Sequence, residues 1–314
     1  MAASPESPSI FKPPSRLGAF VRRNPIALKE LRGRMRGARA FAVLTVYVAL
    51  MSAFAVVLYL IYTASSSVSL TTTGGAIGKT IFGGVVAVEL FLVCFVSPAF
   101  TAGAISGERE RRTFNLLRTT LLSARRIVLG KLVSALAYIV LLLLVAVPLQ
   151  SLAFLMGGVT VEEVLLSVEL LVVTAIGYGA VGLYFSAMTK RTLTASILTY
   201  TFALVTTVAL PLAALVLGVF SGFGTSGGSQ PLLQAILAYL FGLLASTNPV
   251  TAAVLTETTL QQKGTALFFT QTLANGVSIP LVSPWVVFTL LYLVGSYVLI
   301  GLTVHAVRCT QASD

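Results

Sequence analysis

The sequence predicts an all-α polytopic membrane protein that crosses the bilayer six times. Of its 314 residues, 56% are hydrophobic and 10% are charged, whereas a typical soluble domain carries about 25% charged residues. The mean hydropathy is +0.94, and six apolar runs exceed the roughly 18 residues that a spanning helix needs. These runs are 41–62, 80–105, 127–156, 164–188, 194–219 and 284–306.

The distribution of positive charge predicts how these spans are oriented. If the N-terminus lies inside, the cytoplasmic segments hold all Lys and Arg residues except Lys79 and Lys263. This asymmetry is the positive-inside pattern, and it places both termini in the cytoplasm. It also accounts for most of the net charge of +11. We therefore expect contact with membrane lipid and no nucleic-acid partner.

The segment before the first span is amphipathic. Residues 1–23 are expected to form a flexible cytoplasmic tail, and 24–40 to form a helix with one apolar stripe beside one basic stripe. The basic stripe includes Lys29, Arg32 and Arg36. Such a helix lies at the inner membrane surface with its arginines among lipid phosphates. It either anchors the first span or also docks a cytoplasmic protein.

The region between the fifth and sixth spans is too polar for two further crossings. Its apolar stretch 232–247 is short for a span, and Arg308 is predicted to be cytoplasmic. We therefore expect residues 222–283 to form a re-entrant or interfacial hairpin on the outer side. The membrane domain then covers 41–306, and 307–314 form the cytoplasmic C-terminus.

Residues that enzymes use are scarce in this chain. Thr73–Thr80 (TGGAIGKT) ends like a phosphate-binding P-loop, but Thr73 stands where the motif has its first glycine. The only aspartate is Asp314, so an acidic Mg²⁺ ligand of the Walker B type is missing. The single histidine, His305, excludes a histidine cluster for zinc. We expect no catalysis and no bound cofactor or metal in this chain.

Two acids, Glu89 and Glu169, lie inside predicted spans. Acids within a membrane are costly and often line a translocation pathway or a proton relay, so both are candidates for such a pathway. Alternatively, Glu89 bonds to a neighbouring helix and Glu169 reaches water near the outer end of its own helix.

A charged segment, GERERRTFNLLRTTLLSARR, lies between the second and third spans. Its acids Glu108 and Glu110 fall in a predicted first helical turn, where the helix dipole favours negative charge. Phe114 and Leu117 then continue as an apolar row, so a short amphipathic helix is predicted over 107–122. Arginines alone would suit a topology signal on the bilayer. The acids do not, because an anionic membrane surface repels them, and the mixed charges favour a protein partner.

Residues 104–136 (AISGERERRTFNLLRTTLLSARRIVLGKLVSAL) resemble the region after the second span in export-type permeases of ATP-binding-cassette (ABC) transporters. In that family, the pattern ERE..T...LL.T.L....I..GK forms a cytoplasmic coupling loop that engages the ATPase subunit. The amphipathic segment 24–40 is similar to the family's interface helix. The Asn248–Pro249 pair and the last span, which starts at Pro284–Trp285, fit the family's ending.

This resemblance implies a non-catalytic permease subunit of an exporter in the plasma membrane of a bacterium. It would pair with a second permease copy, either identical or related, and with two cytoplasmic ATPase chains that bind ATP and Mg²⁺. The coupling helix 107–122 would contact the ATPase through Glu108, Arg109, Glu110, Arg111, Arg112, Phe114, Leu117 and Arg118. A membrane scaffold that docks the same ATPase, or a proton-coupled carrier that uses Glu89 and Glu169, are the alternatives.

Overall fold

The computed structural model describes Glu30, Gly33 and residues 38–65, 73–113, 123–223, 231–265, 267–272 and 278–312. Among these, six helices are long and apolar enough to cross a membrane. Five are unbroken: α3 (Ala38–Ser65), α4 (Thr73–Thr101), α7 (Ala124–Leu155), α8 (Val161–Met188) and α13 (Pro284–Ala312). The sixth is kinked and comprises α9 (Thr192–Leu204) and α10 (Leu210–Phe223). Each predicted span thus corresponds to one of these helices, in the predicted order.

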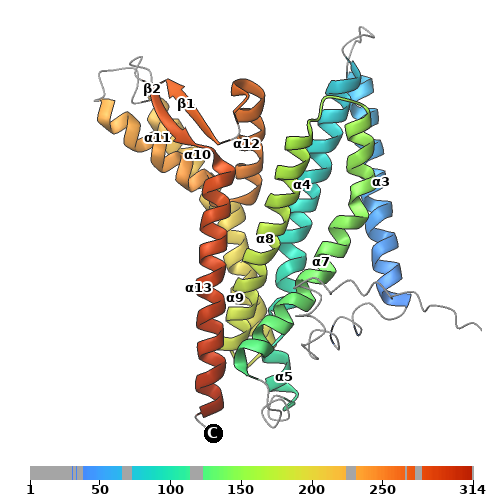
Figure 1. Cartoon of the computed structure of the whole chain (residues 1–314), viewed down its shortest axis with the longest axis vertical. Helices are drawn as coiled ribbons and strands as arrows, with labels where there is room; N and C mark the ends of the chain where they lie inside the picture. The colour runs from blue at the N-terminus through green and yellow to red at the C-terminus, as the bar shows by residue number, and fades with distance from the viewer. Residues whose placement is uncertain are drawn as a thin grey trace, which may run out of the picture.

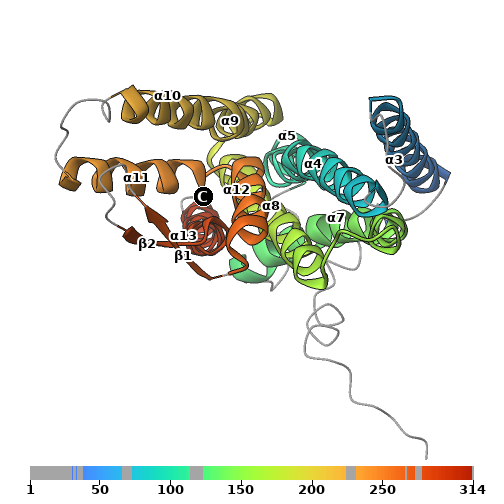
Figure 2. The same ribbon diagram turned by 90° about the horizontal axis from the view of Figure 1, so that it is seen from above.

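Helices α4 and α8 form the centre of the bundle. They pack against each other, and α7 and α13 flank them. Helix α3 lies at one edge, and the α9–α10 pair lies with α11 (Pro231–Ala245) at the opposite edge (Figures 1 and 2). The C-terminus and the short helix α5 (Ser106–Glu110) lie at the lower end in Figure 1. The positive-inside pattern predicts that this lower end is cytoplasmic.

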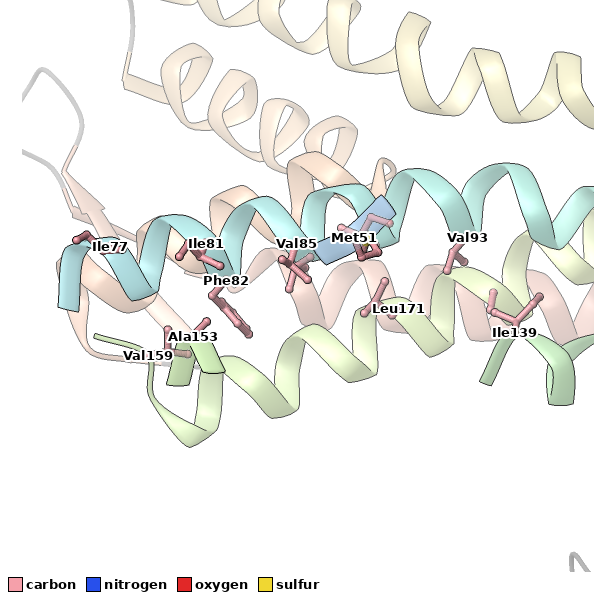
Figure 3. Packing of buried hydrophobic residues seen from close by; sticks show 13 residues of the cluster. Met51, Ile77, Ile81, Phe82, Val85, Val93, Ile139, Ala153, Val159 and Leu171 are labelled. Carbon is pink, nitrogen blue, oxygen red and sulfur yellow. The ribbon is translucent and has the colours of Figure 1, made fainter. Parts of the chain in front are cut away.

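The largest buried apolar cluster runs along α4. Side chains of α4 at helical spacing meet residues of α3, α7 and α8 (Figure 3). The labelled members are Met51, Ile77, Ile81, Phe82, Val85, Val93, Ile139, Ala153, Val159 and Leu171. In a bilayer the lipid tails are as apolar as these side chains, so close packing holds the helices together. This cluster therefore fixes α4 between three neighbours.

Two glycines let α8 approach its neighbours closely. A Cβ atom at Gly177 would collide with the ring of Tyr292 on α13, and one at Gly182 would collide with the Thr101 hydroxyl on α4. Small residues at such contacts are typical of membrane helices whose backbones lie close together. The central position of α8 depends on them.

The fifth span bends at a π-helical turn, Val205–Ala209. A π turn disturbs the regular i→i−4 bonding of a helix and frees carbonyl groups. Asn248 compensates for this, because its side-chain amide donates to the carbonyls of Thr206 (3.1 Å) and Thr207 (2.7 Å). Its Oδ1 atom also accepts from the amides of Val250 and Thr251 and caps helix α12 (Pro249–Lys263). One side chain thus joins the kink to α12.

The predicted outer hairpin, 222–283, contains more regular structure than its composition suggested. Helix α11 packs against α10, and α12 stands against the upper parts of α4, α8 and α13 (Figure 1). Strands β1 (Phe268–Thr272) and β2 (Ser278–Val282) follow as an antiparallel ribbon, in register from Phe268–Val282 to Thr272–Ser278. Helix α12 begins after its capping residue Asn248, with Pro249 as its first residue, and it ends at Gly264 (φ +62°). These local signals outweigh the low apolarity of the Thr-rich segment.

The structure corrects the prediction of one continuous helix over 107–122. Helix α5 ends at Glu110, because Arg112 takes a left-handed conformation (φ +56°). The amide of Thr113 bonds to the carbonyl of Glu108 (2.9 Å), and that of Arg112 bonds to Arg109 (3.0 Å). This pair of bonds is a Schellman motif, which terminates helices. Residues 114–122 lie outside the described residues.

The region around Thr73–Thr80 is helical. Helix α4 begins at Thr73, so TGGAIGKT forms its first turns and the helix starts before the predicted span 80–105. A phosphate-binding P-loop instead follows a strand and precedes a helix. The structure therefore agrees with rejecting the P-loop.

Asn248 gives a test of how the kink is stabilised. The Asn248→Asp variant keeps the oxygen that caps α12 but loses the two N–H donors, so the π-turn carbonyls lose their partners. An unsatisfied buried polar group costs about 1–3 kcal/mol, and we expect a clear fall in melting temperature in nanodiscs. The control Gln262→Glu, on the exposed face of α12, should melt like the wild type. A melting temperature unchanged in Asn248→Asp would contradict this role of the amide.

Candidate functional site

A buried lysine at the lower end of the bundle joins three parts of the chain. Lys131 of α7 is only 2% exposed, and its Nζ atom lies 2.7 Å from Oε1 of Glu108 and 2.9 Å from Oε1 of Glu30. The hydroxyl of Ser134 donates to the other oxygen of Glu30 (2.7 Å). We call these four residues the Lys131 cluster. It links α5 and the segment before the first span to α7.

The burial of the Lys131 ammonium group explains why carboxylates surround it. A buried ammonium group loses the stabilisation that water gives it, and it needs close, well-oriented partners in return. The side chains of Glu30 and Glu108 are 23% and 25% exposed, although Oε2 of Glu108 is buried and has no hydrogen-bond partner among the described residues. The lysine is therefore the buried member, and the acids are the part-exposed groups that compensate for its burial.

The next two residues of α5 bind to the turn between α8 and α9. The guanidinium of Arg109 donates to the carbonyls of Ala187 (2.7 Å) and Thr189 (3.3 Å) at the end of α8. The carboxylate of Glu110 accepts from the amide and from the hydroxyl of Thr192, both at 2.9 Å, where α9 begins. The last carbonyls and first amides of helices lack intrahelical partners. A cation and an anion therefore each meet the helix end that suits them.

The pKa of the Glu110 carboxyl is lowered most by the hydrogen bond from the Thr192 amide and next by the bond from the Thr192 hydroxyl. The positive charges of Arg191 and Arg111 lower this pKa further. Glu110 lies beyond the end of α4, on the predicted cytoplasmic side. Its carboxylate therefore stays ionised at neutral pH and keeps its place at the start of α9.

Ser186 of α8 fixes the beginning of α5. Its hydroxyl oxygen accepts from the amides of Ile105 (2.9 Å) and Ser106 (3.0 Å). Helix α5 is thus bonded to α7 through Glu108, to α8 through Ser186 and Arg109, and to α9 through Glu110. A five-residue helix that would be unstable alone is held by its neighbours.

A family comparison can now be set beside this geometry. The model of a family described as ABC-2 family transporter protein matches residues 24–304. The chain belongs to this ABC-2 transporter family. The resemblance of the segment around α5 to ABC permeases is thereby confirmed over most of the chain. A search of curated proteins gives no match.

Membership has general consequences for this ABC-2 protein. The membrane proteins of the family are typically non-catalytic transmembrane subunits of ABC transporters, and they generally partner with ABC ATPase subunits. The chain is accordingly an ABC transporter permease and a multi-pass membrane protein with six candidate spans. Within the described residues, no group of His, Cys, Asp or Glu side chains is placed to hold a metal ion.

The structure divides the predicted ATPase-contact residues of this ABC-2 permease into three groups. Glu108, Arg109 and Glu110 bond within the chain, as described above. Arg111 and Arg112 are exposed. The remaining predicted contacts, Phe114, Leu117 and Arg118, lie outside the described residues. The same holds for Lys29, Arg32 and Arg36 of the predicted interface helix.

The sequence did not predict which residues bond to α5. Lys131 belongs to the matched motif, yet nothing in its position shows that it pairs with Glu108. Glu30 lies in the predicted amphipathic segment among basic residues, where an acid signals little by itself. Ser186 and Thr192 belong to a turn that carries no motif. Only the packing of α5 against α7, α8 and α9 brings these side chains together.

The two acids predicted to lie within spans contact different helices. Glu89 of α4 is 1% exposed, and its Oε2 atom accepts from the side-chain amide of Gln150 on α7 (2.7 Å). Its Oε1 atom is buried without a hydrogen-bond partner among the described residues. Glu169 of α8 is half-buried and accepts from the Thr289 hydroxyl on α13 (2.8 Å). The expected bond from Glu89 to a neighbouring helix is therefore present, and its Oε1 atom accepts no hydrogen bond from the described residues.

The Lys131 cluster predicts an asymmetric response to neutralising its charges. Glu30→Gln and Glu108→Gln should each be tolerated, because the other carboxylate still balances the ammonium. Lys131→Met, and the double variant Glu30→Gln with Glu108→Gln, should be far worse. Breaking a buried pair from one side costs about 3–5 kcal/mol, and the partial exposure of these acids reduces this to about 1–3 kcal/mol.

Thermal unfolding in nanodiscs measures these differences, and Lys131→Arg serves as the variant that keeps the charge. If Lys131→Met melted at the wild-type temperature, or if each single Glu→Gln variant were as damaging as the double one, the cluster would not be the constraint described here.

Proposed function

We propose that this ABC-2 permease is the membrane-spanning subunit of an exporter in the plasma membrane. It works as a dimer with itself or a related chain, and two cytoplasmic ATPase subunits drive it. The family membership supports the ATP-driven class. The attachment of α5 to three spans supports α5 and the residues after it as the point where force enters.

The hydrogen bonds around α5 indicate how this coupling would work. ATP binding closes the ATPase pair, and the exposed Arg111 and Arg112 with the following segment 114–118 move with it. Since α5 is bonded to the lower ends of α7, α8 and α9, its displacement moves these ends together as a rigid body. Glu30 carries the same motion to the segment before α3.

Glu108, Arg109 and Glu110 would then act as positioning residues. Their charges are already matched by Lys131 and by the helix ends of the α8–α9 turn. Arg111 and Arg112 are the exposed charges of the loop, and so they are the described residues best suited to meet an ATPase. The interface helix residues Lys29, Arg32 and Arg36 would contact lipid phosphates and the same ATPase surface.

The substrate path would run along the interface of the permease dimer, and the 222–283 region would form its outer gate. Asn248 supports this gate, because it connects α12 to the kink of the fifth span. A rearrangement of the kink therefore reaches α12 directly. π-helical turns inside longer helices are frequent at functional sites.

Two other functions have some support. A non-transporting scaffold that docks the same ATPase would use the same loop, and only transport distinguishes it. A proton-coupled carrier would use Glu89 and Glu169, and the unpaired oxygen of Glu89 favours it to that extent. ABC-2 membership favours the exporter over the carrier.

Charge reversal at the loop tests the docking proposal. The permease is co-expressed with its partner ABC ATPase, and the complex is isolated through a tag on the ATPase. The variant Arg111→Glu with Arg112→Glu should reduce the co-purified permease about tenfold or more, since like charges across an interface are strongly unfavourable. Its melting temperature should stay unchanged, because both side chains are exposed.

The matched control is Lys190→Glu with Arg308→Glu, which changes two exposed charges at the same end of the bundle. Normal association of the Arg111/Arg112 variant, with loss in the control, would place the ATPase elsewhere.

Variants of the two acids within the spans test the substrate pathway separately from the coupling to the ATPase. Glu89→Gln should lower transport in proteoliposomes while permease-dependent ATPase activity persists, because Gln150 keeps a hydrogen-bond partner and a carboxyl group that can gain or lose a proton is replaced by an amide that cannot. Glu169→Gln, which keeps an acceptor for Thr289, is the matched control and should transport nearly normally. Equal transport by Glu89→Gln and the wild type would remove Glu89 from the pathway.

A further inference from the structure

A cavity lies at the upper end of the bundle, on the side away from α5. It has a volume of about 270 Å³, is partly open to the surroundings, and is lined by α4, α8 and α12. Pockets for small ligands typically measure roughly 300–1,000 Å³, so it is a small site. Gly83 and Ala87 contribute little side-chain volume to its α4 wall, and a Cβ atom at Gly83 would meet open space.

The walls of this cavity change from charged to apolar along its length. At one end lie Lys79 in the second turn of α4, Glu163 in the first turn of α8, and Glu257 midway along α12. Deeper in the bundle, Leu90, Leu170 and Val250 supply the lining from the same helices. From Lys79 to Leu90, α4 rises by about 16 Å at 1.5 Å per residue. An elongated molecule with one polar end fits this gradient.

The charged rim of the cavity has an excess of one negative charge. Lys79 Nζ lies 3.0 Å from Glu163 Oε1 and 3.0 Å from Glu257 Oε1. Glu163 is also used locally, since its other oxygen accepts from the amide of Thr160 in a capping box (2.8 Å). Glu257 is the more exposed acid, with 32% of its side chain accessible. The unbalanced charge therefore lies nearest to Glu257, where a cation is attracted and an anion is repelled.

One polar group in the cavity wall lacks a partner. Thr256 of α12 is 3% exposed and lines the cavity, and its hydroxyl makes no hydrogen bond within the described part of the chain. Buried polar side chains are nearly always hydrogen-bonded, and each exception calls for an explanation. Its oxygen atom is itself buried, so a ligand group in the cavity would supply the missing bond after the Thr256 side chain rotates toward it.

From these observations we propose that the cavity between α4, α8 and α12 binds a single-chain amphiphile with a positively charged head. The apolar chain lies among Leu90, Leu170 and Val250, and the head lies at the rim beside Glu257 and within reach of Thr256. The site faces the upper half of the membrane, from which such molecules partition. Binding there requires neither an ATPase nor transport, so this proposal goes beyond the proposed function and is tested separately from it.

The test measures binding of radiolabelled dodecyltrimethylammonium to the whole permease in phosphatidylcholine nanodiscs, after subtraction of uptake by protein-free nanodiscs. Competition by unlabelled dodecyltrimethylammonium, dodecanol and dodecyl sulfate compares a cationic, a neutral and an anionic head on the same chain. We expect saturable binding, with the ammonium competing best and the sulfate worst. Equal or stronger competition by dodecanol or dodecyl sulfate would overturn the assignment of a cationic ligand.

Two variants place the binding in this cavity. Glu257→Gln should weaken ammonium binding about tenfold and leave competition by dodecanol unchanged; Lys79 keeps Glu163 as its partner in this variant, so the fold should persist. Gly83→Leu with Ala87→Leu fills the cavity and should abolish saturable binding. The control Gly295→Leu with Gly301→Leu adds comparable volume in open space along α13 and should bind normally. Wild-type affinity in both the Glu257→Gln and the cavity-filling variants would overturn the site.

Discussion

The lower end of this ABC-2 permease is organised by the burial of one ammonium group. Lys131 is 2% exposed, whereas the other two charges of α7, Arg125 and Arg126, are exposed, and a buried charge is tolerated only with close anionic partners. Two carboxylates from separate segments provide them, one from α5 and one from the segment before α3. Because both acids converge on the same nitrogen, Glu30 and α5 are both held against α7. The other contacts of α5, with α8 and α9, add to this attachment.

The alternating charges of Glu108, Arg109 and Glu110 are explained by their contacts within the chain. Membrane orientation alone does not explain them. Consecutive residues of a short helix point in different directions, and here the three side chains reach α7, the end of α8 and the start of α9. Each sign matches its target, since the ammonium attracts an acid, helix carbonyls attract a cation, and helix amides attract an acid. A segment that was expected to contact the ATPase along its whole charged face therefore uses its first three charges inside the chain. It presents the next two, Arg111 and Arg112, to solvent.

Hydropathy and charge distribution predicted the six spans and their order, since both depend on composition over long windows. The features that were missed depend on single backbone conformations or on distant partners. The break at Arg112 uses a left-handed arginine in place of the usual glycine, so no residue type announced it. Helix α12 has an unremarkable composition, and its start relies on Asn248, whose second role at the π turn becomes visible only in three dimensions. Likewise, the Glu89–Gln150 bond joins residues 61 positions apart.

The most direct measurement of the central claim is a cross-link from the loop to the ATPase. An Arg111→Cys chain that also carries Cys309→Ser, so that the exposed native thiol is removed, is reconstituted with its ATPase and treated with a short thiol-to-lysine cross-linker. The account predicts a cross-link between position 111 and the ATPase whose yield changes when ATP is added. It would be contradicted if position 111 gave no such cross-link while a cysteine in place of exposed Lys190, in the same Cys309→Ser background, reacted with the ATPase.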